Sequence, residues 1–210
     1  DLHKAIRRQR QMCIRDRCYI GTKWDYMGEK TVIVTRQHPQ GHFTMGVYLV
    51  DIYCKGLLHS EYFFNMNHDD YEMMVKRIDM DEDLKKAAYA DAHKLVYGAI
   101  DFAEAVGIDS EDSFDITKYI LDEKKEEIPF AEFGRNGKHY LRADTDEEAE
   151  LYIPIIMEAI GTDFTYSIEG VTDGEVDAAE VPFGDFDFSE LNYDEEEFDK
   201  MFEKLNRNIQ

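Results

Sequence analysis

Long apolar stretches are missing from this sequence. No uninterrupted apolar run reaches the roughly eighteen residues that a membrane-spanning helix needs, and no apolar core follows the basic N-terminal residues as it would in a signal peptide. Cysteine is also scarce, and Cys13, Cys18 and Cys54 form neither a C-x-x-C pair nor an evenly spaced disulfide framework. We therefore expect a cytoplasmic protein with reduced thiols and no membrane association.

The chain is short of basic residues. It has 24 lysines and arginines against 46 acidic residues, which gives a formal net charge of −22. A surface that follows nucleic-acid phosphates needs clustered lysine and arginine to displace counterions, so we expect no direct binding to nucleic acid. The charge favours a basic protein surface as partner. The simplest alternative is that the charge only keeps the protein in solution.

Compact catalytic signatures are absent as well. The sequence contains no G-x-S-x-G, no H-E-x-x-H, no phosphate-binding glycine loop and no dinucleotide-binding glycine pattern. This disfavours enzyme classes that carry such signatures, and we expect no cofactor. The chain does contain 43% hydrophobic and 13% aromatic residues over its 210 positions, which is enough to fold one compact domain.

The first seventeen residues differ from the rest of the chain in charge. They contain six lysines and arginines but only two acids, and residues 12–17 (MCIRDR) match the in-frame translation of a transposon end used in sequencing libraries, ATG TGT ATA AGA GAC AG. We interpret residues 1–17 as an assembly artefact or a disordered arm and leave them out of the fold. The alternative is a genuine basic arm that binds nucleic acid.

Residues 18–170 are expected to form a compact α+β domain with a mostly antiparallel sheet of two hairpins plus extra strands. β-Branched and aromatic residues fill 31–36 and 43–54, and the turn between them contains proline and glycine, which predicts the first hairpin. The second of these runs is apolar on both alternating faces, as in a strand that is covered on both sides. Residues 61–66 predict a third, shorter strand.

The second predicted hairpin comes later in the chain. Residues 130–133 and 139–142 read as strands on either side of an Asn-Gly dipeptide, which is a strong hairpin signal because both residues tolerate positive φ. Residues 164–168 alternate like a final strand. The sheet is therefore expected to include strands from both halves of the chain.

One long helix and several short ones are expected to pack on this sheet. Residues 84–106 place alanines, Leu95 and Phe102 on one stripe, which predicts a core helix that approaches the sheet closely. Asp69 is followed by a glutamate three positions later, which predicts a capping box for a short helix. Thr145 and Glu148 predict another.

Residues 171–210 are expected to form an acidic tail. Residues 173–199 hold twelve acidic residues and no basic one, and residues 189–205 could form an amphipathic helix. Aromatic side chains interleaved with these acids are the candidate interaction residues: Phe183, Phe186, Phe188, Tyr193, Phe198 and Phe202.

Four polar residues are candidates for chemistry. Asp51 is the first catalytic candidate, because a carboxylate within an apolar run must be paired or perturbed if it is buried. His93 lies at the margin of the long helix's apolar stripe and is a candidate general base. His38 and His42 bracket the first turn and, with a carboxylate, form a candidate metal site. The structural alternatives are that Asp51 pairs with Arg36 or with backbone groups, and that the histidines are exposed or lie at a boundary.

These observations leave two functional hypotheses. The favoured one is a non-catalytic interaction module that binds a basic partner through its acidic aromatic tail, with nucleic-acid mimicry as a sharper version. The alternative is a hydrolase, metal-dependent or not, centred on Asp51 with His38, His42 or His93. A third possibility is that the tail folds back as a helix over the sheet and is structural.

Overall fold

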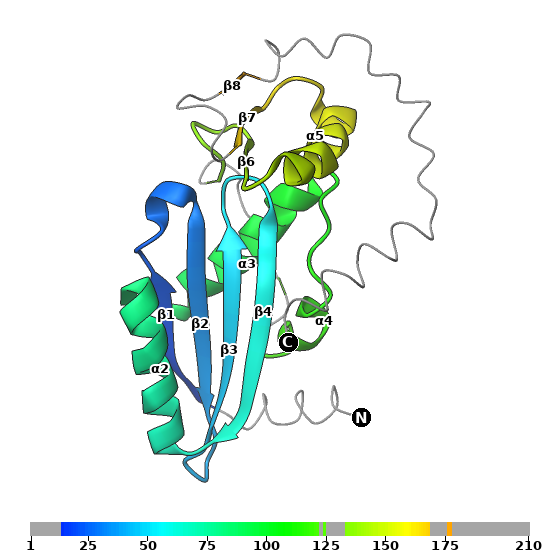
Figure 1. Cartoon of the computed structure of the whole chain (residues 1–210). Coiled ribbons are helices and arrows are strands. Elements are labelled where there is room, and N and C mark those ends of the chain that lie inside the picture. The colour runs from blue at the N-terminus through cyan, green and yellow to red at the C-terminus, as the bar shows by residue number, and fades with distance from the viewer. Residues whose placement is uncertain (1–13, 122–123, 125–132, 169–175, 178–210) are drawn as a thin grey trace. The chain divides into compact units, whose positions relative to one another are not determined.

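The computed structural model describes residues 14–121, 124, 133–168 and 176–177 (Figure 1). The fold is α+β, as predicted. The strands are β1 (Ile14–Gly21), β2 (Glu29–Gln37), β3 (Phe43–Asp51), β4 (Gly56–Met66), β5 (Leu84–Ala87), β6 (Tyr140–Ala143), β7 (Thr165–Ile168) and β8 (Val176–Asp177). The helices are η1 (Asp25–Met27), α2 (His68–Glu82), α3 (Tyr89–Glu104), α4 (Phe114–Thr117) and α5 (Asp146–Ile160). None of the helices in these ranges is long and apolar enough to cross a membrane.

The main sheet has five strands in the order β4-β3-β2-β1-β5, and all neighbouring strands are antiparallel. β2 and β3 form the predicted first hairpin, in which Gln37 pairs with Phe43 at the turn and Glu29 pairs with Asp51 at the far end. The third predicted strand is also present, but β4 starts at Gly56 and is 11 residues long. A long strand therefore lies at one edge of the sheet and the short β5 at the other.

β1 overlaps the segment that we assigned to an artefact or a disordered arm. It begins at Ile14, pairs with β2 on one side and pairs with β5 on the other. Residues 14–17 therefore extend a strand of the main sheet, whereas residues 1–13 lie outside the described residues. The origin of this segment stays a prediction, as do the domain boundaries derived from it.

The predicted long helix is wrong at its start. Residues 84–87 form the edge strand β5, and α3 begins only at Tyr89. The chain turns into β5 at Asp83, whose φ of 49° ends α2, and Leu84 then pairs with β1. The apolar spacing could not reveal this strand, because the exposed Lys85 and its neighbour suit a helix and an edge strand equally well.

One of the two predicted helix caps is confirmed. Thr145 Oγ1 accepts a hydrogen bond from the backbone N–H of Glu148 at 3.2 Å, as expected at the start of α5. The cap of α2 is Asn67 rather than Asp69. Asn67 Oδ1 accepts from the backbone N–H of Asp70 at 2.9 Å, and Asp69 already lies within the helix.

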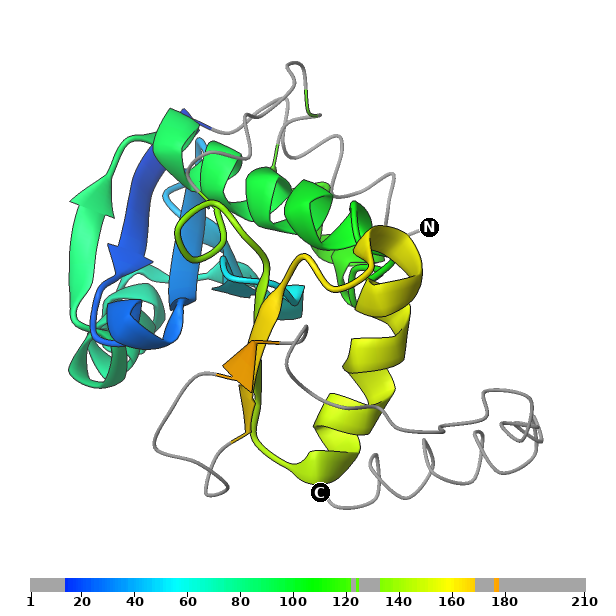
Figure 2. The ribbon, with the colours of Figure 1, turned by 90° about the horizontal axis from the view of Figure 1, so that it is seen from above.

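Two helices cover opposite faces of the main sheet (Figures 1 and 2). The α3 face holds the larger core, which includes Val32, Val34, Tyr48, Val50, Ala92, Val96, Ala99 and Phe102. The α2 face holds a smaller core of Ile33, Phe43, Met45 and Tyr71. Alternate residues of β2 and β3 thus enter different cores, which confirms that the second apolar run is covered on both sides.

The strand predicted at residues 139–142 pairs differently from our prediction, and it belongs to a second sheet of three strands, in the order β6-β7-β8, rather than to the main sheet. Residues 130–132 of its predicted hairpin partner lie outside the described residues. Arg135 and Lys138 form an isolated bridge around the Asn-Gly turn, but β6 pairs in parallel with β7. α5 connects β6 to β7, and a helical crossover of this kind returns the chain in a parallel direction. The Asn-Gly dipeptide correctly predicts the turn, because a turn depends on neighbouring residues. The strand that pairs with β6 depends instead on α5, which follows β6 in the chain. β7 confirms the final predicted strand.

Candidate interaction surfaces

Asp51 ends β3 and caps the turn that leads into β4. Its side chain is only 3% exposed, and its carboxylate oxygens accept hydrogen bonds from the backbone N–H groups of Tyr53 at 2.7 Å and Lys55 at 3.1 Å. Burial raises the pKa of Asp51 to about 6 against the lowering effect of these hydrogen bonds. Of the two structural alternatives for Asp51, hydrogen bonding to backbone groups is confirmed. Pairing with Arg36 is wrong, because the register places Arg36 opposite Thr44, near the other end of β3.

The turn that Asp51 caps is joined to α5 and to the second sheet. Lys55 Nζ lies 2.9 Å from Glu148 Oε1, and these side chains are 9% and 25% exposed. Burial lowers the pKa of Lys55, but the hydrogen bond and the charge of Glu148 outweigh it, so that the pKa is raised overall. Tyr140 at the start of β6 donates its backbone N–H to the carbonyl of Tyr53 at 3.1 Å. The charged groups near Asp51 therefore hold parts of the fold together.

His38 and His42 lie at the turn of the first hairpin. His38 Nε2 lies 2.8 Å from Thr44 Oγ1, and burial, followed by the charge of His42, lowers the pKa of His38. Asp51 is at the opposite end of β3, and the strand rise of about 3.4 Å per residue places it about 27 Å from Phe43. The structure therefore does not bring Asp51 together with either histidine. Within the described part of the chain, no three His, Cys, Asp or Glu side chains are grouped so that they could hold a metal ion.

His93 is also separated from Asp51. It lies in the first half of α3, with its ring centroid 4.6 Å from that of Tyr97. Gly56, just after the turn that Asp51 caps, packs against the second half of α3, where a Cβ added at Gly56 would lie 2.6 Å from the Cβ of Ala103. The helix rise between His93 and Ala103 is about 15 Å, so the imidazole and the carboxylate belong to different parts of the core.

The predicted interaction residues of the acidic tail lie outside the described residues. They are Phe183, Phe186, Phe188, Tyr193, Phe198 and Phe202, and the helix predicted at 189–205 lies there too. Of the predicted tail, the structure describes Val176 and Asp177, which form β8 and pair with β7. The role of the tail in binding stays a prediction.

α2 presents an acidic surface with exposed methionines. The helix contains six acidic residues, and its basic residues are Lys76 and Arg77. Met73 and Met80 are 66% and 76% exposed. They lie seven positions apart, which is close to two helical turns, so both project from the same side of α2. Large exposed apolar side chains in a charged surrounding are typical of a protein-binding surface.

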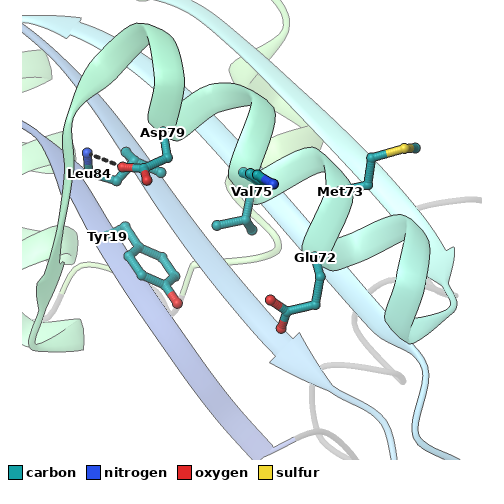
Figure 3. A pocket seen from close by; sticks show the side chains of 7 residues that line it. Tyr19, Glu72, Met73, Val75, Asp79 and Leu84 are labelled. Carbon is teal, nitrogen blue, oxygen red and sulfur yellow. Dashed lines mark hydrogen bonds between the residues drawn. The ribbon is translucent and has the colours of Figure 1, made fainter.

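A hollow of about 640 Å³ lies between α2 and the strands β1 and β5 (Figure 3). We call it the α2 hollow, and it is lined by Tyr19, Glu72, Met73, Val75, Lys76, Asp79 and Leu84. Glu72 Oε1 lies 2.6 Å from Arg17 Nη1, and Asp79 Oδ1 accepts a hydrogen bond from the backbone N–H of Leu84 at 2.8 Å. The carboxylates of Glu72 and Asp79 are therefore held in position at a hollow whose apolar lining includes Val75 and Leu84.

A second hollow, of about 380 Å³, lies at the outer edge of β4 next to α4. We call it the β4 hollow, and it is lined by Ser60, Glu61, Tyr62, Phe63, Ser113, Ile116 and Thr117. Ser60 donates its backbone N–H to Ser113 Oγ at 3.1 Å, and its own Oγ lies 2.7 Å from Thr117 Oγ1. These hydroxyl groups attach α4 to one point of a much longer strand.

Sequence reasoning missed both hollows. The seven-residue spacing of Met73 and Met80 was visible, and methionines outside the apolar stripe of an acidic helix are a usable signal for a binding surface. The β4 hollow has no local signal. Ser60 and Thr117 are far apart in the sequence, and the tertiary fold alone brings their side chains together.

Comparisons with known proteins do not identify this chain. No protein-family model, curated protein or solved structure matches it. What the protein does must therefore be inferred from its own residues and surfaces.

Proposed function

We propose that this protein is a non-catalytic interaction protein that binds a basic protein surface. The observation that carries the proposal is α2, where Met73 and Met80 stand exposed on a helix with six acidic residues. Apolar side chains of this size provide contact area that loses water on binding, and the surrounding carboxylates steer and orient a basic partner. The α2 hollow, next to Met73, offers a recess for a partner side chain.

The acidic tail supports the proposal from the sequence. Residues 173–199 combine twelve acidic residues with aromatic ones and contain no lysine or arginine, so the tail, like α2, carries both carboxylates and large apolar side chains. We include the tail in the proposed binding region, with Phe186 and Phe188 among its apolar contacts. A cytoplasmic location is part of the proposal, because Cys18 and Cys54 are buried thiols.

The hydrolase hypothesis lacks comparable support. Asp51 uses both carboxylate oxygens to cap a turn, and its raised pKa has burial as its cause. His38 and His42 lie at the other end of β3, and His93 lies in another part of the α3 core. No observation favours this second function over binding.

The test is affinity capture from a cell lysate with the intact chain, with residues 182–210 deleted, and with Met73→Lys combined with Met80→Lys. We expect the same basic proteins to be recovered about tenfold less with each altered form, because hot-spot contacts and charge complementarity are lost. Recovery should also fall as the salt concentration rises, because salt screens exposed charges. Mass spectrometry measures both effects.

A matched control separates the α2 surface from a general effect of added lysine. Tyr26 on η1 and Leu151 on α5 are also exposed apolar residues, and changing both to lysine adds the same charge on elements other than α2. This control should leave recovery unchanged. Recovery that is insensitive to salt, and equal for the intact chain and both altered forms, would overturn the proposed function.

A further inference from the structure

The outer edge of β4 is a long strand edge. β4 is the last strand of the main sheet, and among the described residues no strand pairs with it on the side away from β3. Its 11 residues contain neither lysine nor proline, two residues that commonly protect an edge from pairing with another chain. Its pairing with β3 is irregular next to Leu57 and after Phe63 and is regular from His59 to Phe63, which is the stretch that a further strand would use. α4 contacts it near Ser60. The following Tyr62, Phe63 and Phe64 make this edge aromatic.

The direction of the backbone groups along β4 can be inferred from Ser60. Its N–H donates to Ser113 Oγ, on the outer side, so it points away from β3. Backbone groups alternate in direction along a strand, and therefore the N–H and C=O of Tyr62 point outward as well, while Glu61 faces its partner Val47 in β3. Tyr62 thus offers one outward donor and one outward acceptor to a further strand, next to Ser60, whose N–H is bonded to Ser113.

The β4 hollow lies beside these backbone groups. Its volume of about 380 Å³ and its apolar contributors Tyr62, Phe63 and Ile116 suit an apolar side chain of an added strand. Side chains of a strand alternate between its two faces, so one residue would enter the hollow and its neighbours would point the other way. The site therefore selects an extended segment rather than a helix.

The charges around this edge are mainly acidic. The segment from 109 to 115, which leads into α4, contributes four carboxylates and no basic side chain: Asp109, Glu111, Asp112 and Asp115. Glu61 adds a further carboxylate on β4. The imidazole of His59 lies between two of these carboxylates, with its Nε2 3.4 Å from Glu61 Oε1 and its Nδ1 3.7 Å from Glu111 Oε2. Lys118, at the end of α4, is hydrogen-bonded to Asp115. A second copy of this chain, with its net charge of −22, would be repelled here, whereas a cationic segment would be attracted.

We propose that the β4 edge binds an extended basic peptide segment of a partner protein, which adds a sixth strand to the main sheet and places an apolar side chain in the β4 hollow. The added strand pairs with the outward groups of Tyr62, and its lysine or arginine side chains meet Glu61 and Glu111. This is the strand-addition mode of peptide recognition. The inference rests on the proposed function in one respect, namely that the partner is basic.

Three synthetic peptides test the inference on the intact chain by nuclear magnetic resonance. The first alternates lysine with valine, the second has the same sequence with N-methyl groups on alternate backbone nitrogens, and the third replaces each lysine with glutamate. We expect the first to bind and to shift the amide signals of Ser60 and Tyr62. The second should bind about tenfold or more weakly because it cannot form the strand hydrogen bonds, and the third should not bind.

Two substitutions locate the site on the protein. Tyr62→Pro removes the outward N–H at an edge position where proline is tolerated, and Glu111→Lys reverses a charge at the rim. Both should weaken binding of the lysine-valine peptide about tenfold. Glu158→Lys, at an exposed position of α5 outside both proposed surfaces, makes the same charge change and should have no effect. Should Tyr62→Pro unfold the chain, the N-methylated peptide still tests strand pairing on the unaltered protein.

The outcomes distinguish the two proposals. Equal binding of the methylated and unmethylated peptides, or shifts that avoid Ser60 and Tyr62, would overturn strand addition and leave the proposed function intact. Equal or tighter binding of the glutamate peptide would contradict the basic partner, and with it the proposed function. Absence of binding by the lysine-valine peptide, while capture of basic proteins through α2 persists, would overturn only the β4 site.

Discussion

The two faces of the main sheet are covered by helices of similar length but of very different character. α3, with 16 residues, contributes seven buried ones: Ala92, Val96, Gly98, Ala99, Ile100, Phe102 and Ala103. α2, with 15 residues, contributes only Tyr71. The first helix is part of the core, whereas the second is attached to the sheet along a narrow line and leaves most of its surface to solvent.

The difference follows from the side chains of the two helices. Small residues on α3 allow its backbone to approach β4 closely, so that a Cβ added at Gly56 would lie only 2.6 Å from that of Ala103. α2 has large charged residues on its outer side and attaches through Tyr71, whose ring stacks on Phe43 with centroids 4.5 Å apart. One face therefore supplies stability, and the other is available to a partner.

The largest predicted effect tests how tightly the α3 face is packed. Gly56→Ala should lower the free energy of unfolding by about 4 kcal/mol, because the new methyl group overlaps Ala103 and its φ of 73° is strained for alanine. Gly41→Ala is the matched control, with a φ of 86° and no neighbour within 4 Å, and should cost about 1 kcal/mol. Chemical denaturation measures both. Equal costs would mean that the α3 face is not closely packed at β4.

A second prediction concerns the pH dependence of the turn that leads into Gly56. The pKa of Asp51 is about 6 in the folded protein and 3.8 ordinarily, so between these values the folded state binds more protons than the unfolded state. The free energy of unfolding therefore falls as the pH rises through this interval, by about 3 kcal/mol in all. Asp51→Asn should remove this component. The variant should be about 1 kcal/mol less stable than the unaltered chain below pH 4, because the amide cannot accept from both Tyr53 and Lys55, and about 2 kcal/mol more stable above pH 6, where the unaltered chain has lost the contribution.

Denaturation at a series of pH values measures this contribution. The exposed Asp69, when changed to asparagine, is the control and should leave the slope between about pH 4 and pH 6 as in the unaltered chain. A slope that Asp51→Asn leaves unchanged would show that Asp51 is not the group whose burial governs stability in this interval.

The smallest predicted effect tests the attachment of α2. Tyr71→Phe removes the hydroxyl that lies 3.2 Å from Thr35 Oγ1 and should cost about 1 kcal/mol, because a buried hydroxyl of Thr35 loses its partner. Amide hydrogen exchange should become faster in α2 than in α3, because Tyr71 is the one fully buried residue of α2, whereas Met74, Val75 and Ile78 are only partly buried against the smaller core. Equal acceleration in both helices would remove the distinction between the two faces.

Much of the main sheet was predictable because its signals are local. The alternation in β2 and β3 and the turn between them depend on residues close in the sequence, and the same is true of the Thr145 cap. The start of α3 was not predictable, because residues 84–87 become a strand only when β1 lies beside them. The partner of β6 was hidden for a similar reason, since α5 decides which strand returns next to it.

The candidate sites divide in the same way. The excess of carboxylates was countable from the sequence, and a buried Asp51 was foreseeable from its apolar neighbours. Hydrogen bonding of Asp51 to backbone groups was one of the expected alternatives and is confirmed, but its donors, Tyr53 and Lys55, were not foreseeable, because they belong to a turn whose geometry depends on the contact between Gly56 and α3. Met73 and Met80 were visible but ambiguous, since exposure depends on how a helix is rotated against the sheet.

The sequence by itself determined that this chain is acidic, that it folds as α+β around an antiparallel hairpin, and where several helices and strands begin, because charge is additive and capping and alternation act over a few residues. Only the tertiary structure decided that α2 displays its methionines, that β4 forms an edge, and that Ser60 meets Thr117. These features depend on which distant segments pair, and pairing is selected by the packing of the whole fold rather than by any local pattern.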